Sequence, residues 1–269
     1  MTDSSKPNPS DNLVQYNKSA WNAQVQRKNQ WTRPVTSQQI ADARNGNWSI
    51  VLTPAKPVPR EWFPDFSSGE ISVLCLAGSG GQQAPILAAA GAKVTVFDLS
   101  PGQLGQDKLV AQREGLSIET VQGDMRDLSC FADGSFDLIV HPCSNCFVPD
   151  VRPVFREAAR VLKPGGSILT GFTNPVFYIF DYNEMEKGNL KVAHSIPYSD
   201  LTSIPADEQQ KLVDDDEPFC FGHSLTDQIA GQIESGLQIT GFSEDIWPEF
   251  VISDYIPAFV LTKATKPKS

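Results

Sequence analysis

Short apolar runs alternate with helix-like stretches in the part of the chain that begins at residue 71. Five of these runs have the length and composition of buried strands, and they cover residues 71–76, 93–97, 117–121, 136–140 and 166–172. Helix-like stretches lie at 82–90, 102–114 and 151–162, and the last of them meets the stop signal Lys163-Pro164-Gly165-Gly166. This alternation predicts right-handed βαβ units and a mostly parallel sheet.

The segment before this pattern has a different texture. Residues 1–12 are rich in Ser, Pro, Asn and Asp, which predicts a disordered tail. Residues 13–70 predict a lid or connector, with a helix at 37–44 for which Ser37 is the expected cap. Four prolines between residues 53 and 66 predict an extended path there, because proline fits neither a helix interior nor a central strand.

The rhythm also breaks after the fifth strand. Residues 173–222 contain several aromatic residues and then an acidic run, and we interpret them as an insertion. Regularity returns with a helix around 224–235 and strands around 237–242 and 258–263. Residues 71–269 are therefore predicted to form one α/β domain that carries this insertion.

Charge and composition exclude several functions. The 269 residues carry a formal net charge of −10, and an acidic surface repels phosphate backbones, so nucleic acid is not an expected partner. No apolar run is long enough to span a bilayer, and the polar N-terminus lacks the pattern of a signal peptide. We therefore expect a cytoplasmic location without a membrane partner. Nothing in the sequence indicates the oligomeric state.

The five cysteines do not indicate a metal centre. Cys143 and Cys146 form a C-x-x-C pair, but no second pair of cysteines or histidines completes a zinc site. The odd number of cysteines also argues against a disulfide framework. We therefore expect no metal.

Three features of a ligand-binding edge follow the first three strands in order. A turn of small residues, Ala77-Gly78-Ser79-Gly80-Gly81, allows close approach to a ligand at the start of a helix. Asp98 ends the second strand roughly 20 residues later, the spacing at which a carboxylate reaches ribose hydroxyls. Gly123-Asp124-Met125 ends the third strand at the same edge. Each feature alone also fits a tight turn, a helix cap or a surface acid, but the ordered set indicates a binding cleft.

Together with the fourth strand and the Val161–Gly166 stop signal, this order resembles the class I S-adenosylmethionine-dependent methyltransferases, and in particular the type 11-like members. The resemblance covers residues 71–172 well and extends to 236–263, which look like the closing hairpin of that family. It implies a Rossmann-like, seven-stranded, mostly parallel sheet with helices on both faces and an antiparallel last strand. It also implies S-adenosylmethionine as methyl donor, S-adenosylhomocysteine as product and an SN2 transfer.

The resemblance also implies roles for individual residues. Asp98 would bind both ribose hydroxyls, Asp124 would accept a hydrogen bond from the adenine amino group, and Met125 would lie against the adenine ring. The other implied cofactor-binding residues are Ala77, Gly78, Ser79, Gly81, Leu99, Gln103, Gly123 and His141.

Two departures from the family pattern affect the turn. The family often has an acid in the middle of the first strand, where this chain has Cys75, and its usual G-x-G-x-G turn is replaced by Ala-Gly-Ser-Gly-Gly. The missing acid removes one usual support for the turn and for the methionyl amine. This version resembles a smaller, uncharacterised bacterial subgroup, and the likeness extends to Trp31–Thr36 and Lys56–Phe63.

The loop after the fourth strand lies beside the transferred methyl group in this fold. It contains His141, whose ordinary pKa near ~6.5 suits a catalytic base, and Asn145, which would orient the acceptor. Methyl transfer mainly requires that the nucleophile is held in line with the sulfur–carbon bond. The alternative is that His141 only orients the loop and that Cys143 and Cys146 are packed thiols.

Aromatic residues outside the sheet pattern are candidates for covering the cofactor and binding the acceptor. Tyr16, Trp21, Phe177 and Tyr178 are expected to take this role, with Asn145 as a further acceptor-binding residue, although ordinary packing also explains any single aromatic residue. A covered pocket suits a small-molecule acceptor. The sequence does not indicate which acceptor is used or which atom is methylated.

Two other functions share part of this pattern. An NAD(P)-dependent Rossmann oxidoreductase would explain the turn and Asp98, but not Gly123-Asp124-Met125, and residues 78–83 lack the last glycine of G-x-G-x-x-G. A non-catalytic module that keeps the cofactor site is the third possibility, because a fold alone does not establish a function.

Overall fold

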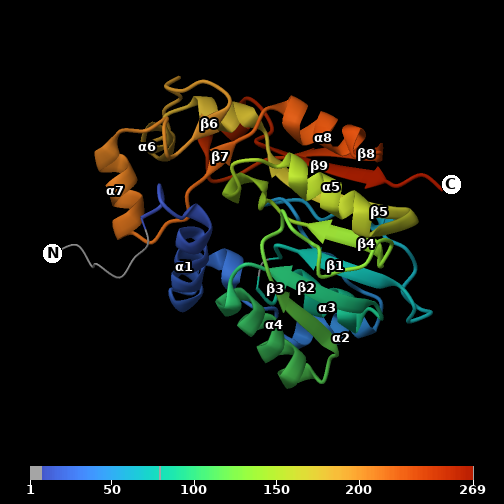
Figure 1. Cartoon of the computed structure of the whole chain (residues 1–269). Helices are drawn as coiled ribbons and strands as arrows, with labels where there is room; N and C mark the ends of the chain where they lie inside the picture. Colours follow the sequence, from blue (N-terminus) through green and yellow to red (C-terminus); the bar gives the residue numbers. More distant parts are fainter. Residues whose placement is uncertain (1–7, 79, 269) are drawn as a thin grey trace.

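A seven-stranded sheet forms the centre of the computed structural model, which describes residues 8–78 and 80–268 (Figure 1). The strand order is β3-β2-β1-β4-β5-β9-β8, in which the first five strands are parallel and β9 runs antiparallel to both of its neighbours. The strands are β1 (Ser72–Leu76), β2 (Lys93–Asp98), β3 (Ile118–Gln122), β4 (Phe136–His141), β5 (Leu162–Thr173), β8 (Gln238–Asp245) and β9 (Phe259–Thr265). The expected Rossmann-like α/β fold is confirmed.

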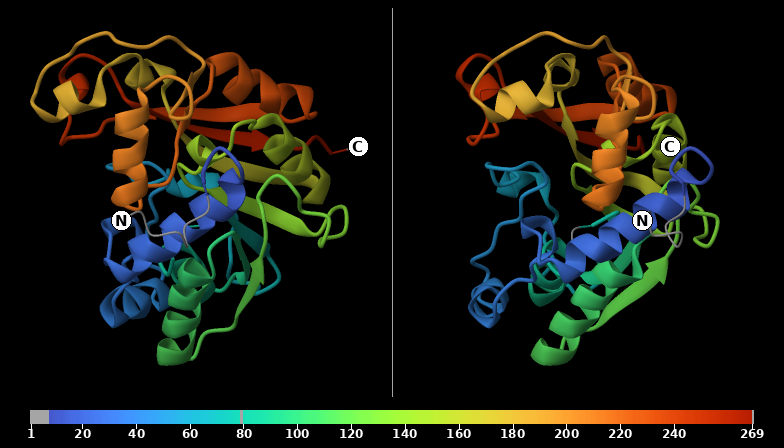
Figure 2. Two further views of the ribbon diagram at one scale, coloured as in Figure 1. Left: turned by 60° about the vertical axis from the view of Figure 1, so that its left-hand side comes forward. Right: turned by 90° about the vertical axis from the view of Figure 1, so that its left-hand side faces the viewer.

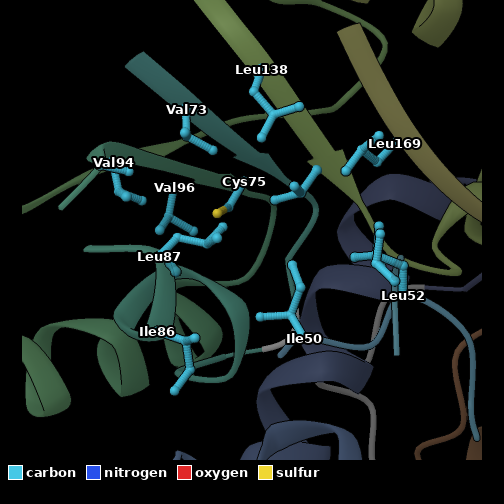
Figure 3. Packing of buried hydrophobic residues seen from close by; sticks show 14 of the residues in the cluster. Ile50, Leu52, Val73, Cys75, Ile86, Leu87, Val94, Val96, Leu138 and Leu169 are labelled. Carbon is cyan, nitrogen blue, oxygen red and sulfur yellow. The ribbon is translucent and has the colours of Figure 1, made fainter. Parts of the chain in front are cut away.

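Both faces of the sheet are covered because its central strands are apolar on both sides. Val73 and Cys75 of β1 belong to one buried cluster, whereas Leu74 and Leu76 belong to another, as the alternation of side chains along a strand requires. Figure 3 shows Val73 and Cys75 on the face that packs against α3. The helices that cover the two faces are α2 (Ser37–Arg44), α3 (Gln83–Ala89) and α4 (Pro101–Glu114) on one side and α5 (Arg152–Val161) on the other.

Helix ends agree with the sequence in some places and correct it in others. Ser100, which directly precedes Pro101, caps α4 by accepting a hydrogen bond from the Gln103 N–H. The cap of α2 is Thr36 rather than Ser37, because Thr36 forms a reciprocal capping box with Gln39. The expected helix around 224–235 is a π-helical turn, Thr226–Ala230, that continues into α8 (Gly231–Glu234).

Helix α1 of the N-terminal segment and the insertion lie at the edge of the sheet where the parallel strands end (Figures 1 and 2). The elements there are α1 (Leu13–Gln26), α6 (Tyr182–Glu186), β6 (Tyr198–Ser199), α7 (Ala206–Asp214) and β7 (Phe221–Gly222). Strands β6 and β7 pair with each other as a separate small sheet. Among the described residues, no helix has the length and apolar character needed to cross a membrane.

The predicted disordered tail lies partly outside the described residues, which begin at Asn8. Residues 8–12 form contacts that the composition does not reveal. Pro9 is buried, and the Asn12 side chain caps α1 by accepting a hydrogen bond from the Gln15 N–H at 3.0 Å. The disordered tail at residues 1–12 stays a prediction.

A strap, which we define as residues 51–57, crosses the carboxyl ends of the central strands. The carbonyl oxygen of Leu52 accepts a hydrogen bond from the Cys143 N–H at 3.2 Å. The buried carboxylate of Asp245 accepts from the N–H groups of Ala55 and Lys56 at 2.9 and 2.8 Å. The proline-rich connector is thus held in place by the loop after β4 and by the end of β8. A 3₁₀ turn at Arg60–Trp62 is its only helical part among the described residues.

Candidate active site

The carboxyl ends of the parallel strands open into a cavity of about 1080 Å³. Its wall combines the strand ends with α1, the strap and the insertion. The residues singled out from the sequence that line it are Trp21, Ala77, Gly78, Asp98, Leu99, Gln103, Gly123, Asp124, Met125, Phe177 and Tyr178. The fold therefore brings most of the expected cofactor and acceptor residues into one space.

The turn after β1 is braced from several sides. The N–H of Ala77, which has a φ of 47°, donates to the carbonyl oxygen of Phe97 at 2.7 Å, and the Ser144 hydroxyl donates to the carbonyl oxygen of Ala77 at 2.8 Å. The Gly80 N–H donates to Oε1 of Gln103 at 2.9 Å, so Gln103 supports the turn as well as lining the cavity. Ser79, an expected cofactor residue, lies outside the described residues.

Gly81 does not face the cavity. Its φ of 77° favours glycine, and a Cβ at this position would lie 2.9 Å from the Cβ of Pro34 in the N-terminal segment. The carbonyl oxygen of Gly81 also accepts a hydrogen bond from the Val35 N–H at 2.9 Å. Gly81 therefore joins the turn to the N-terminal segment, and the geometry does not support its predicted contact with the cofactor.

Asp98 ends β2 as a buried carboxylate at the cavity wall. Its Oδ1 accepts a hydrogen bond from the Ser100 N–H at 2.8 Å. Among the described residues, no basic side chain forms an ion pair with Asp98. Burial raises the pKa of Asp98 to about 7, although the N–H groups of Ser100 and Leu99 oppose this shift. The site thus holds a desolvated acceptor group with remaining capacity for hydrogen bonds.

The edge after β3 is held close to Asp98 by small and apolar residues. The Gly123 N–H donates to the carbonyl oxygen of Asp98 at 3.0 Å, and a Cβ on Gly123 would lie 2.2 Å from the Phe97 ring. Met125 is buried and lines the cavity. Both carboxylate oxygens of Asp124 accept hydrogen bonds from the Arg126 guanidinium, so its predicted hydrogen bond from the adenine amino group stays a prediction.

His141 and Asn145 are buried behind the cavity wall, not in it. The His141 Nδ1 lies 2.8 Å from the carbonyl oxygen of Leu76, and its Nε2 lies 2.7 Å from Oδ1 of Asn145. The Asn145 amide donates to Oε1 of Gln228 at 2.8 Å, and burial lowers the pKa of His141. This geometry does not support the predicted roles of catalytic base, cofactor contact or acceptor contact. Instead, the pair joins the end of β1 to the loop after β4.

The replacement His141→Leu is expected to lower the free energy of unfolding by about 2–5 kcal/mol, because it leaves two buried hydrogen-bonding groups without a partner. Urea denaturation followed by tryptophan fluorescence measures this loss. The replacement Asn145→Leu interrupts the same network, so the double variant should lose less than the sum of the two single variants. An unchanged stability of His141→Leu would contradict the structural role.

The aromatic candidates divide into two groups. Trp21, Phe177 and Tyr178 line the cavity. Tyr16 is buried away from it, and its hydroxyl donates to the carbonyl oxygens of Glu217 and Leu212 at 3.0 and 3.3 Å. Tyr16 therefore fastens α1 to the insertion, which corrects its predicted role in acceptor binding.

The structure adds residues to the wall that were not singled out from the sequence. They include Gln83, the 51–54 part of the strap, Tyr198 and Asp200 of the insertion, and Phe250 near the last hairpin. Gln83 was visible in the Gly-Gly-Gln-Gln run after the first strand, whereas the strap and the last hairpin reach the cavity only through tertiary contacts. Among the described residues, no three His, Cys, Asp or Glu side chains form a group able to hold a metal ion.

Comparison with known proteins places this geometry in a family. Residues 74–170 match the family model of a methyltransferase domain. The chain is 50% identical over 254 residues to YbaJ of Bacillus subtilis (strain 168), described as an uncharacterized methyltransferase, and the match covers 94% of this chain and 98% of that one. The chain therefore belongs to the class I S-adenosylmethionine-dependent methyltransferases.

More distant relatives share the central domain or the fold. The sarcosine/dimethylglycine N-methyltransferase of Halorhodospira halochloris is 34% identical over 102 residues, which are 37% of this chain and 36% of that one. The solved S-adenosylmethionine-dependent methyltransferase of Mesorhizobium loti has a TM-score of 0.59 at 20% identity and covers 77% of this chain and 95% of its own. The solved structure supports the fold alone.

Proposed function

We propose that the chain transfers the methyl group of S-adenosylmethionine to a small-molecule acceptor bound in the same cavity. The observation that carries this proposal is the continuity of the cavity, which runs from Asp98 at the sheet to Phe177 and Trp247 beyond it. A relative named for sarcosine and dimethylglycine, both small molecules, supports it. A cytoplasmic location stays a prediction from the sequence.

The residues at the sheet edge fit the cofactor chemically. Asp98 offers a buried acceptor for ribose hydroxyls, and Met125 offers an apolar surface for the adenine ring. The turn at 77–78 leaves room for the methionyl part because its residues are small. S-adenosylmethionine is positively charged at its sulfonium. The cavity wall suits this charge because it contains the buried carboxyl group of Asp98, which has no ion-pair partner among the described residues.

The cofactor, when bound, supplies an electrophilic methyl group on a sulfonium. The chain has to hold the acceptor in line with that group and exclude water. A cluster of aromatic rings is suited to hold the acceptor and exclude water. The Phe177 ring stacks on the Trp247 ring with 5.7 Å between ring centroids, and the centroid of the Phe250 ring lies 4.6 Å from that of Trp247. Their faces support an apolar or cationic acceptor.

The insertion makes this part of the wall acidic. Its acidic residues at the cavity are Asp181, Glu186, Asp200, Glu208, Asp215 and Glu217. Lys211 is the one Lys or Arg of the described insertion residues that lines it. An acceptor with a net negative charge would be repelled, so we propose an acceptor that is neutral overall or cationic.

Calorimetric titration with S-adenosylhomocysteine and, separately, with NADH tests the proposal. We expect micromolar binding of S-adenosylhomocysteine and no binding of NADH. The protein is then incubated with methyl-labelled S-adenosylmethionine and a panel of small amines, alcohols and phenols, with matched carboxylates as controls. Transfer of label to a member of the panel supports the proposal, and binding of NADH in place of S-adenosylhomocysteine would overturn it.

A further inference from the structure

One end of the bound cofactor, the methionyl α-ammonium, needs oxygen atoms that accept its hydrogen bonds. The turn after β1 offers few of them. Cys75 of β1 is a buried thiol whose pKa is raised by burial, so it carries no charge. The carbonyl oxygen of Ala77 already accepts the hydroxyl of Ser144. A further acceptor for this group can come from elsewhere in the cavity wall.

Gln83, the first residue of α3, lines the cavity directly after the turn and has an unused acceptor. Only 4% of its surface is exposed, and its Nε2 donates to the carbonyl oxygen of Val51 in the strap at 3.1 Å. This bond fixes the orientation of the amide. Its Oε1 is consequently a buried oxygen without a hydrogen-bond partner among the described residues.

A buried oxygen of this kind destabilises the fold unless a bound ligand donates a hydrogen bond to it. A buried acceptor left without a partner costs about 1–3 kcal/mol, and native structures contain few of them. The cavity wall also holds the buried carboxyl group of Asp98, and its ionised form favours a cationic ligand.

We propose that Oε1 of Gln83 binds the α-ammonium of the methionyl group, with the strap orienting the amide through Val51. This assignment rests on the proposed methyl-transfer function. It gives Gln83 a role in the recognition of one functional group of the cofactor.

The test compares two ligands in calorimetric titrations of the full chain. One is S-adenosylhomocysteine, and the other is its deamino analogue, in which hydrogen replaces the α-amino group. The native chain should prefer S-adenosylhomocysteine by about 10- to 100-fold. In Gln83→Met, which keeps the length of the side chain, this preference should fall to about 2-fold or less while the analogue binds as before.

Two further variants make the result specific. Gln82→Met changes the neighbouring glutamine, whose Nε2 donates to the carbonyl oxygens of Gln30 and Arg33, and it should keep the native preference. Gln83→Glu retains an acceptor and should keep or increase the preference, even if Gln83→Met does not fold. Equal weakening of both ligands in Gln83→Met, or an unchanged preference, would overturn the assignment. Failure of the native chain to bind S-adenosylhomocysteine would instead remove the proposed function.

Discussion

Replacing Asp98 by alanine should weaken the binding of S-adenosylhomocysteine at least about 100-fold. The proposed contact is a pair of charge-assisted hydrogen bonds from ribose hydroxyls, each worth about 1.5–3 kcal/mol. No other acidic side chain ends β2, so neighbouring residues do not replace the lost acceptor. Calorimetric titration of the Asp98→Ala variant measures the loss. Binding within a few-fold of the native value would show that the cofactor lies elsewhere in the cavity.

The same carboxylate should make cofactor binding depend on pH. Burial raises the pKa of Asp98 to about 7 in the ligand-free protein, so at pH 6 only about a tenth of the molecules carry the charged acceptor. If the hydroxyls bind the ionised form, affinity should rise about tenfold from pH 6 to pH 8. Burial also raises the pKa of the neighbouring Asp107, to about 8, so the decisive comparison is with Asp98→Ala, which should lose the part of the pH dependence that belongs to Asp98.

The stability contributed by Asp98 should fall with rising pH, whereas cofactor affinity should rise. Measuring both quantities separates a variant that has lost a ligand contact from one that is misfolded. The pKa of Asp98 is about 7 in the folded chain against an ordinary value of 3.8, so folding favours the protonated form. The contribution of Asp98 to the free energy of unfolding of the ligand-free protein therefore falls as the pH rises from about 4 to about 7. The Asp98→Asn variant keeps an acceptor for the Ser100 N–H without the charge, and it should unfold at a higher temperature than the native chain at pH 8. A lower unfolding temperature would contradict the buried-charge interpretation.

The sequence predicts the sheet well because its information is local. Each parallel strand is a short apolar run between turn signals, and the small-residue turn, Asp98 and Gly123 all follow strand ends. Once the strands are parallel, their carboxyl ends meet at one edge, and the residues after them have to share a cleft. This explains why most of the expected cofactor residues line the cavity.

The buried position of His141 could not be predicted because the sequence of β4 does not reveal which way its last side chain points. The strand is apolar almost throughout, so no alternation of polar and apolar residues distinguishes its faces. The structure shows that Ile139 packs in the cluster beneath α5, and His141, two residues later, points to the same face. There it meets Asn145 and, through it, Gln228, a residue more than 80 positions away along the chain.

The residues that cover the cavity could not be predicted either, because the sequence does not show which way their side chains point. The aromatic content of the insertion indicated a covering segment, but not which rings face inward. Tyr16 and Trp21 both belong to α1, yet Tyr16 packs edge-on against Phe219 and Trp21 against Phe147 at the cavity wall. Gln82 and Gln83 are neighbouring residues of the same type. Only Gln83 donates to the backbone of the strap, and the sequence does not reveal the path of the strap that brings them together.

Replacing Asn17 by leucine should have the largest effect on the cover itself. This side chain, only 2% exposed, accepts a hydrogen bond from the Phe219 N–H at 2.9 Å. Its amide donates to the carbonyl oxygens of Phe219 and Phe147, both at 3.2 Å. One residue of α1 thus holds both the end of the insertion and the loop after β4. Leucine leaves these backbone groups unpaired, so we expect a loss of about 2–5 kcal/mol in the free energy of unfolding, measured by urea denaturation.

The loss of the Asn17 hydrogen bonds should also increase the mobility of the cavity wall, because α1 and α7 both contribute side chains to it. Trp21 of α1 would no longer be held against Phe147, and S-adenosylhomocysteine should dissociate about tenfold faster in stopped-flow measurements. Protease sensitivity should increase between α7 and β7, where Asn17 is bound to the insertion. The control is Lys18→Ala on the same helix, whose stability we expect to stay within about 0.5 kcal/mol of the native chain. If Asn17→Leu destabilised the chain without changing the dissociation rate, α1 would be a packing element of the domain and not a cover for its cofactor.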